Sequence, residues 1–195
     1  MNQSLKVRRL VEAAMIAAIY TVLTYAAAAL NLAYPGVQFR FSEALTILPV
    51  FTPSAIPGLA IGCFLSNLGS PMGIIDWISG TSATLLAAVL TRLLRNLTVK
   101  GLPVLAPFPP VLTNAVIVGC VIAVTDPAGF SVPLFAAMAL SVGLGELAVC
   151  YGLGLPLIAV LKKTGVSKRI FLESQESPKR LYITYAYCFS EKDGY

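Results

Sequence analysis

The sequence contains no histidine, and its four cysteines show no CxxC spacing. Both absences argue against a zinc or haem site, because such sites are built mainly from histidine and closely spaced cysteine. A Walker A loop, a GxSxG motif and an HExxH motif are also absent. We therefore expect no nucleotide hydrolysis and no peptide cleavage by a familiar motif, and we predict a protein that is not an enzyme and uses no cofactor or metal.

Charge is scarce as well. Charged residues make up 12% of the 195 residues, hydrophobic residues make up 57%, and the mean hydropathy is +0.80. These values lie outside the soluble globular range and indicate an integral membrane protein. The net charge of +5 does not indicate nucleic-acid binding, because the basic residues lie beside apolar segments, as orientation signals and contacts with anionic lipids do.

The basic residues that are present follow a pattern. Thirteen of the fourteen fall in three clusters, which are Lys6, Arg8 and Arg9, then Arg92, Arg95 and Lys100, then seven residues from Lys162 onward. Basic residues that flank membrane spans stay in the cytoplasm, so an even number of crossings should separate successive clusters. Only Arg40 lies apart, and it is the first basic residue that we suspect of a role other than setting topology.

Four apolar segments are long enough to cross a bilayer, which takes about 20 residues per helix. They are 10–32, 76–95, 107–125 and 132–161. The intervening segment 44–75 carries no charge over its 32 residues. As one crossing, it would place the second and third basic clusters outside the cell, against the positive-inside rule.

Two short spans, 41–53 and 55–70, separated at Pro53 and Pro57, return all three clusters to the cytoplasm. We therefore predict an all-α, multi-pass protein of the cell membrane, with six transmembrane helices and both termini cytoplasmic. A span of about 13 residues is too short to cross as a straight helix. We expect neighbouring helices to shield the span 41–53, or non-helical backbone to continue it beside a cavity.

Polar groups within the spans are the candidates for function, because inserting an ionisable group costs about 2.5–3.5 kcal/mol. Glu43 follows Arg40 by three positions. The two residues either neutralise each other at the outer interface, or Glu43 faces a ligand that Arg40 orients. Glu146 lies in the middle of a span, where it either bonds to Asn114 across helices or faces a ligand.

Asp76 and Trp77 stand at the start of a predicted helix. Asp76 could cap that helix, contact a ligand or do both, and Trp77 could be an interfacial anchor.

Stripes of small residues indicate close helix contacts. Ala13, Ala14, Ala17 and Ala18 form one stripe, for which internal packing and an external partner both remain open, and Gly58, Gly62 and Ser66 form another, for which internal packing is favoured.

Three segments carry a family resemblance: VQFRFSEALTILPVFTPSAIPGLAIGCFLSNL (37–68), PVLAPFPPVLTNAVIVG (103–119) and LSVGLGELAVCYGLGLPL (140–157). They resemble the QueT family, the substrate-capturing S components of energy-coupling-factor (ECF) transporters. RFSEAL and GLGELAVCY are the most specific parts. The resemblance implies a six-helix S-component domain over residues 1–163, a pocket near the outer face, and docking onto an ECF scaffold membrane subunit that carries two ATPase subunits. We expect the polar tail 164–195 to lie in the cytoplasm, and the resemblance does not imply a role for it.

The resemblance also implies the substrate, because QueT-like proteins take up queuosine precursors, which are 7-substituted 7-deazaguanines. A guanine-type edge offers adjacent N–H donors that a carboxylate can bind bidentately, so Glu43 and Glu146 are the candidate acceptors. Asn67 and Asn114 would bind the exocyclic O6 and a ring nitrogen. Trp77 or aromatic residues of the first outer loop such as Tyr34 would stack on the base, and Asp76 would balance a cationic aminomethyl group.

The predicted substrate-binding set is thus Arg40, Glu43, Asn67, Asp76, Trp77, Asn114 and Glu146, and the predicted scaffold contact is Ala13 with Ala17 or Ala14 with Ala18. Three alternatives remain open at this point. They are an S component for a different small vitamin-like molecule, an ion-coupled carrier that works alone, and a membrane scaffold or sensor without transport.

Overall fold

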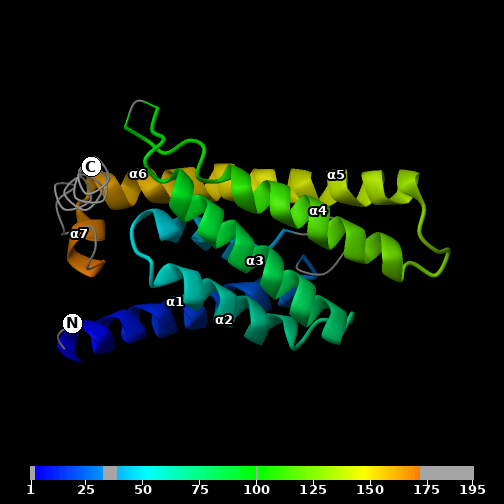
Figure 1. Ribbon diagram of the computed structural model, residues 1–195, viewed down its shortest axis with the longest axis horizontal. Helices are drawn as coiled ribbons and strands as arrows, with labels where there is room; N and C mark the ends of the chain where they lie inside the picture. Colours follow the sequence, from blue (N-terminus) through cyan, green and yellow to red (C-terminus); the bar gives the residue numbers. More distant parts are fainter. Residues whose placement is uncertain (1–2, 33–38, 100, 172–195) are drawn as a thin grey trace, which may run out of the picture.

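The computed structural model describes residues 3–32, 39–99 and 101–171 of the chain (Figure 1). The helices in this part are α1 (Gln3–Ala29), η1 (Phe41–Val50), α2 (Ala55–Asn67), α3 (Ile74–Leu94), α4 (Phe108–Thr125), α5 (Val132–Val149), η2 (Cys150–Gly154), α6 (Leu155–Lys163) and α7 (Val166–Ile170). Extended pairing among the described residues is limited to an isolated bridge between Val99 and Leu102. The predicted all-α class is confirmed.

Four helical segments are long and apolar enough to cross a membrane: α1, α3, α4 and the continuous 32-residue run of α5, η2 and α6. The helices η1 and α2 are shorter and also apolar, and they fall in the predicted short spans 41–53 and 55–70. Each of the six predicted spans therefore contains a helix. The number of crossings and the side on which the termini lie stay predictions.

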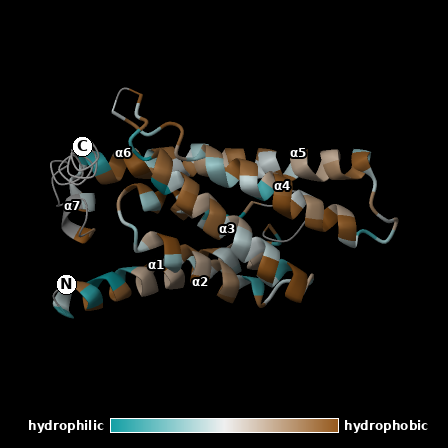
Figure 2. Ribbon diagram, viewed as in Figure 1, coloured by the Kyte–Doolittle hydropathy of each residue, from teal (hydrophilic) through white to brown (hydrophobic). Residues whose placement is uncertain are grey.

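Helices that follow one another in the sequence pack side by side, α1 with α2, α2 with α3, α3 with α4, and α4 with α5. Their outer surfaces are apolar, as a bilayer requires, and Leu10, Ile78 and Leu140 are examples of large exposed side chains. Figure 2 shows hydrophobic residues along all the long helices, whereas hydrophilic residues gather at the start of α1 and in the connections.

The central element is η1, a ten-residue 3₁₀ helix that contacts α1, α3 and η2. A 3₁₀ helix rises about 2.0 Å per residue against 1.5 Å in an α-helix, so ten residues reach about 20 Å instead of 15 Å. Glu43, Ile47 and Leu48 are among its buried residues. The predicted shielding of this short span by its neighbours is confirmed.

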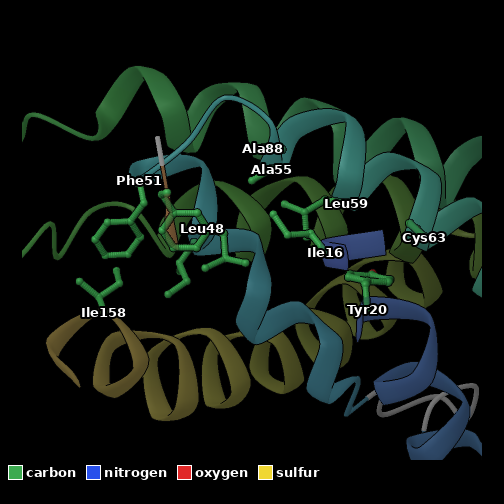
Figure 3. Packing of buried hydrophobic residues seen from close by; sticks show 11 residues of the cluster. Ile16, Tyr20, Leu48, Phe51, Ala55, Leu59, Cys63, Ala88 and Ile158 are labelled. Carbon is green, nitrogen blue, oxygen red and sulfur yellow. The ribbon is translucent and has the colours of Figure 1, made fainter. Parts of the chain in front are cut away.

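The helix η2 is a π-helical turn that joins α5 to α6. Pro156, just after it, has no N–H to give to the preceding turn, and an inserted residue is a common adjustment near such a site. A Cβ on Gly154 would lie 3.3 Å from Ile47 Cγ2, so the glycine allows η1 to lie close to η2. Around this contact, Leu48, Phe51 and Ile158 form part of the apolar core (Figure 3).

The small-residue stripes of α1 and α2 interlock. A Cβ on Gly58 would lie 2.7 Å from the Ala13 carbonyl oxygen, and one on Gly62 would lie 2.9 Å from that of Ala17. Internal packing of the glycine stripe is therefore confirmed. Ala13 and Ala17 are buried against α2, which corrects their assignment to a partner interface, because a partner cannot reach them.

The other two alanines of that stripe, Ala14 and Ala18, are exposed on the neighbouring face of α1, about 100° around the helix. A partner contact through Ala14 and Ala18 stays a prediction.

The described members of the basic clusters lie at one end of the molecule. The start of α1, the end of α3 and the end of α6 come together at the left of Figure 1. Lys162 Nζ donates to the Gly101 carbonyl (2.9 Å), and Arg92 Nη1 donates to the Pro49 carbonyl at the end of η1 (2.9 Å). This shared end, called the basic end below, is what the positive-inside argument requires.

Candidate functional site

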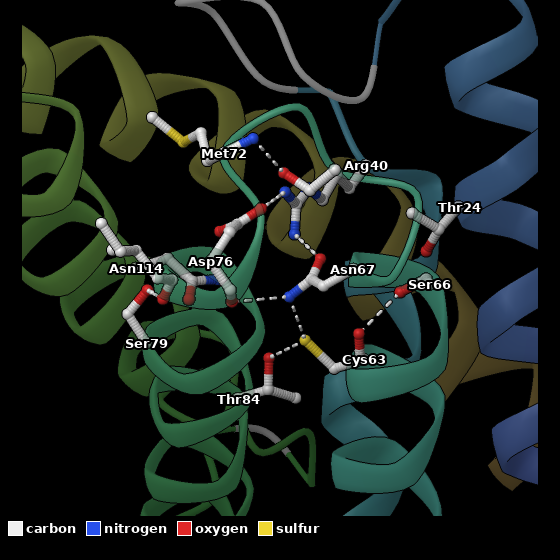
Figure 4. A network of polar contacts seen from close by, with 12 residues as sticks. Thr24, Arg40, Cys63, Ser66, Asn67, Met72, Asp76, Ser79, Thr84 and Asn114 are labelled. Atoms are coloured by element: carbon white, nitrogen blue, oxygen red, sulfur yellow. Dashed lines mark hydrogen bonds and ion pairs between the residues drawn. The ribbon is translucent and has the colours of Figure 1, made fainter. Parts of the chain in front are cut away.

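The first polar cluster lies away from the basic end, where α2 ends and η1 and α3 begin. It consists of Arg40 before η1, Asn67 at the end of α2 and Asp76 in the first turn of α3. All three side chains are buried, and they point toward one another in Figure 4. Three element ends thus bring together residues that are far apart in the sequence.

Arg40 is the centre of this cluster. Its Nη1 donates to Asn67 Oδ1 at 3.2 Å, and its Nη2 lies 3.7 Å from Asp76 Oδ2 in an ion pair. The ion-pair partner is thus Asp76, where the sequence had suggested Glu43. The reason is local, because Arg40 has an extended backbone (φ −89°, ψ 102°) and precedes the helix on which the two side chains would have aligned.

Asn67 holds the cluster together. Its Nδ2 donates to the Asp76 carbonyl at 3.2 Å and to Cys63 Sγ at 3.4 Å, while its Oδ1 accepts from Arg40. A Cβ on Gly80 would lie 2.5 Å from Asn67 Nδ2, so α3 needs a glycine there. Asn67 is fully buried and already bonded at both amide atoms, which favours an orienting role over the predicted ligand contact.

Asp76 lies within the first turn of α3, whose N-cap residue is Gly73. The predicted capping role is therefore wrong, because the chain enters the helix three residues earlier. The carboxylate still lies near the positive end of the helix dipole. Its partner is Arg40, so its predicted role as the counter-charge of a ligand would have to compete with that ion pair.

A second polar cluster lies further along η1. It contains Glu43, Tyr20 of α1, Asn114 of α4, Glu146 of α5 and Cys150 of η2. The Tyr20 hydroxyl donates to Glu43 Oε1. The carboxyl groups of Glu43 and Glu146 also interact electrostatically with each other, and both interact with Arg40.

Glu146 has partners for both of its oxygens. Asn114 Nδ2 donates to Glu146 Oε1 at 2.9 Å, which is the interhelical bond that the sequence predicted as one alternative. Cys150 Sγ, one turn further on, lies 3.5 Å from Glu146 Oε2. Glu146 is thus satisfied within the protein, and a ligand would have to share these oxygens.

Glu43 is different. The side chain is 2% exposed, and its Oε2 atom is buried with no hydrogen-bond partner among the residues that the structure describes. The Asn114 amide also interacts with the Glu43 carboxyl group, but without a hydrogen bond to this atom. A buried carboxylate oxygen without a donor is unfavourable by about 1–3 kcal/mol or more. Glu43 Oε2 is therefore the atom of this cluster best suited to accept a donor from a bound ligand.

Trp77 lies apart from both clusters. Its ring is half-buried and meets Phe64 of α2 edge to face, with 6.5 Å between the ring centroids. The contacts that build the two polar clusters, within the described ranges, do not involve it. Stacking of Trp77 on a base stays a prediction, and Tyr34 of the first outer loop lies outside the described residues.

An apolar groove of about 410 Å³ lies elsewhere, on the outer side of α4. It is lined by Ile75, Val116, Ile117, Cys120, Val121, Val124 and Thr125. It contains none of the predicted site residues and offers no charged group. The side chains of the two polar clusters, in contrast, are buried.

Sequence reasoning missed four residues that help to build the site. Tyr20 bonds Glu43, Thr46 Oγ1 donates to the Glu43 carbonyl at 2.6 Å, and Cys150 approaches Glu146. Thr24 Oγ1 donates to Ser42 Oγ at 2.7 Å and ties α1 to the start of η1. Only Cys150 carried a signal, because it stands four residues after Glu146 and so shares its helix face.

Comparisons with known proteins agree on one family. A family described as QueT transporter matches residues 10–163. One curated relative, named queuosine precursor transporter QueT, from Lactococcus lactis subsp. cremoris (strain MG1363), is 36% identical over 76 residues. That alignment covers 39% of this chain, and the chain spans only 44% of the relative's length. No solved structure matches the chain.

Proposed function

Because the chain belongs to the QueT transporter family, we propose that it is the substrate-capturing S component of an ECF importer for queuosine precursors. The substrates would be 7-deazaguanines such as 7-cyano- or 7-aminomethyl-7-deazaguanine. The name of the Lactococcus relative supports this substrate class. The observation that carries the proposal is the buried Glu43 Oε2, an acceptor without a donor beside a second carboxyl group.

The chemistry of a deazaguanine suits this acceptor. Its N1–H and exocyclic amino group are donors, and binding would give Glu43 Oε2 the hydrogen bond that it lacks. A ligand without those donors would leave the oxygen unsatisfied in a dry site, which is how buried polar groups discriminate between analogues. Since Tyr20 already occupies Oε1, the contact would use one oxygen of Glu43, in place of the bidentate pairing expected from sequence.

Arg40 would act indirectly. Its contacts with Asp76 and Asn67 fix the guanidinium at the end of the bundle, and its charge acts on both Glu43 and Glu146. In this proposal Arg40 lowers the cost of keeping two carboxyl groups close together. The base would be held by Glu43, with Asn114 and Glu146 beside it.

The arrangement of the ends supports the direction of uptake. Arg40 precedes η1 and Asp76 lies in the first turn of α3, and α3 begins away from the basic end (Figure 1), so a cytoplasmic basic end would put the polar site toward the exterior. The chain has no Walker A loop, and in this proposal an ECF scaffold subunit with two ATPase subunits supplies the energy. Ala14 and Ala18, the exposed alanines of α1, would contact that scaffold.

Binding is tested on the purified full chain. Mass spectrometry of the extracted protein should identify a deazaguanine, and added 7-aminomethyl- or 7-cyano-7-deazaguanine should raise the melting temperature. Glu43→Gln should weaken binding at least about tenfold, because it replaces one acceptor oxygen by a donor. If neither compound stabilises the protein and another small molecule co-purifies, the substrate assignment is wrong.

Transport is tested in proteoliposomes. Uptake of the radiolabelled base should require the scaffold, both ATPases and ATP. Uptake by the chain alone, driven by an ion gradient, would identify a carrier that works without partners. Normal uptake by Glu43→Gln and Glu146→Gln variants would contradict the proposed binding site and favour a sensor or scaffold role.

A further inference from the structure

Helices α1 and η1 run antiparallel, and three side-chain hydrogen bonds join them. Thr52 Oγ1, just beyond η1, donates to Glu12 Oε2 at 3.0 Å near the basic end. Tyr20 donates to Glu43 in the middle, and Thr24 donates to Ser42 near the start of η1. Of the three bonds, only the one from Tyr20 ends on the carboxylate that has an unpartnered oxygen.

From this geometry we infer that Tyr20 is a specificity-determining positioning residue: its hydroxyl fixes Glu43 Oε1, so that Oε2 alone is presented to the substrate. The inference rests on the proposed function and deepens it, because it states how the site distinguishes one ligand edge from another. Tyr20 does not touch the substrate, and it acts through the orientation of Glu43.

The position of Tyr20 is itself tightly fixed. The residue is fully buried, and it lies beside Leu59 and Cys63 of α2 in Figure 3. A Cβ on Gly62 would lie only 2.8 Å from Tyr20 Cβ, so the interlock of α1 with α2 holds the tyrosine at its base. A donor held in this way can impose an orientation on a carboxylate, whose terminal torsion is otherwise broad.

Other acceptors near Glu43 are already occupied. Glu146 Oε1 accepts from Asn114, and Glu146 Oε2 faces the Cys150 thiol. The Cys150 sulfur also lies 3.6 Å from the Glu43 carbonyl oxygen, which Thr46 Oγ1 approaches from η1 itself. The acceptor offered at this point is therefore a single oxygen atom in a fixed direction, and it selects a ligand that places an N–H there.

Loss of the hydroxyl should loosen this selection. In Tyr20→Phe, Glu43 Oε1 would lose the donor that now orients the carboxylate, and the carboxylate could rotate to suit ligands with different edges. Thr24→Val is a matched control, because it also removes a buried α1 hydroxyl that bonds to η1 but leaves Glu43 with its tyrosine. Each variant loses one hydrogen bond between α1 and η1, but only the bond from Tyr20 orients the Glu43 carboxylate.

The experiment compares two ligands on the full chain in nanodiscs, by calorimetry. One is 7-aminomethyl-7-deazaguanine, and the other is its analogue without the 2-amino group, the donor that Glu43 Oε2 would accept in this proposal. The wild type should prefer the first ligand by about a hundredfold. Tyr20→Phe should reduce that preference about tenfold, and Thr24→Val should keep it.

A second test uses Glu43→Gln and remains informative if Tyr20→Phe folds poorly. With Tyr20 present, the side-chain carbonyl of the substituted amide should accept from the tyrosine hydroxyl, so the amide N–H₂ points at the ligand and binding falls about a hundredfold. Without the hydroxyl, the amide can turn, so Tyr20→Phe combined with Glu43→Gln should bind about tenfold better than Glu43→Gln alone.

The outcomes distinguish a failure of the role inferred for Tyr20 from a failure of the proposed function. If the wild type binds the deazaguanine and Glu43→Gln weakens binding, but Tyr20→Phe keeps the wild-type preference and the double variant binds no better than Glu43→Gln alone, the role of Tyr20 is overturned while the proposed function survives. If the wild type binds neither ligand, the proposed function fails, and the inference fails with it.

Discussion

At the scale of single residues, Arg40 is a buried charge whose ion-pair partner, Asp76, is buried as well. A buried ion pair adds little net stability, because desolvation of both ions offsets their attraction. Removal of one partner is different, since the other is left charged and unpaired. The contact of Arg40 with Asp76 therefore makes each residue necessary to the other.

We expect Arg40→Met to lower the free energy of unfolding by about 3–5 kcal/mol, because Asp76 would remain as an uncompensated buried charge. Denaturant titration in detergent measures the change. The double variant Arg40→Met with Asp76→Leu should recover most of the loss. Equal instability of the single and double variants would show that the ion pair is not the source of the effect.

At the scale of elements, the interlock of α1 with α2 sets the position of Tyr20 and thus of the site. Gly58→Ala places a methyl group 2.7 Å from a backbone oxygen of α1, which cannot move aside without shifting the helix. We expect a loss of about 1–3 kcal/mol in unfolding free energy, measured by thermal or denaturant unfolding.

Gly152→Ala is the control for that prediction. A Cβ at Gly152 would meet nothing within 4 Å, and alanine suits a helix better than glycine does. This variant should be neutral or slightly more stable. A comparable loss in both variants would mean that glycine flexibility, and not close packing, explains Gly58.

The positions of the helices were the part of the structure that could best be predicted from the sequence. The uncharged runs and the three basic clusters located the helices from α1 to α6, and the break at Pro53 separated η1 from α2. The bond between Asn114 and Glu146 could be foreseen because both are isolated polar groups in long apolar helices. The 3₁₀ and π geometries could not be, because they depend on contacts such as that of Gly154 with Ile47.

The buried polar residues could be predicted from the sequence, but their pairings could be predicted much less well. Arg40 and Asp76 are 36 positions apart, and Tyr20 and Glu43 are 23 apart. Contacts at such separations depend on how helices cross, which a single sequence does not encode in any local pattern. A neutral tyrosine in an apolar helix also carries no charge signal, so Tyr20 could not be distinguished from a packing residue.

At the scale of the whole molecule, the chain has a basic end and a first polar cluster that lies away from it. Topology can be tested with single cysteines, because Cys63 and Cys150 are buried and the other two cysteines can be replaced by serine. Ala128→Cys lies in the turn between α4 and α5, and Thr164→Cys follows α6. We expect an impermeant maleimide to label Ala128→Cys on intact cells and Thr164→Cys only after permeabilisation. The reverse pattern would overturn the proposed orientation.

The core also extends beyond the part of the chain that matches the family, which ends at residue 163. Phe171 is buried and stacks on Phe51 at 5.8 Å, close to the end of η1. We expect Phe171→Ala to cost about 3 kcal/mol in unfolding free energy, whereas Ile170→Ala, whose side chain is 49% exposed, should change little. Equal effects of the two substitutions, measured by thermal unfolding, would contradict this packing.

The 3₁₀ geometry of η1 has one mechanical consequence. The same ten residues wound as an α-helix would be about 5 Å shorter. With Pro49 and Val50 held by Arg92 at one end, rewinding would retract the other end along its own axis and pull Glu43 away from Tyr20. A change of helix pitch in η1 would therefore separate Glu43 from Tyr20 while the lipid-facing helices stay in place.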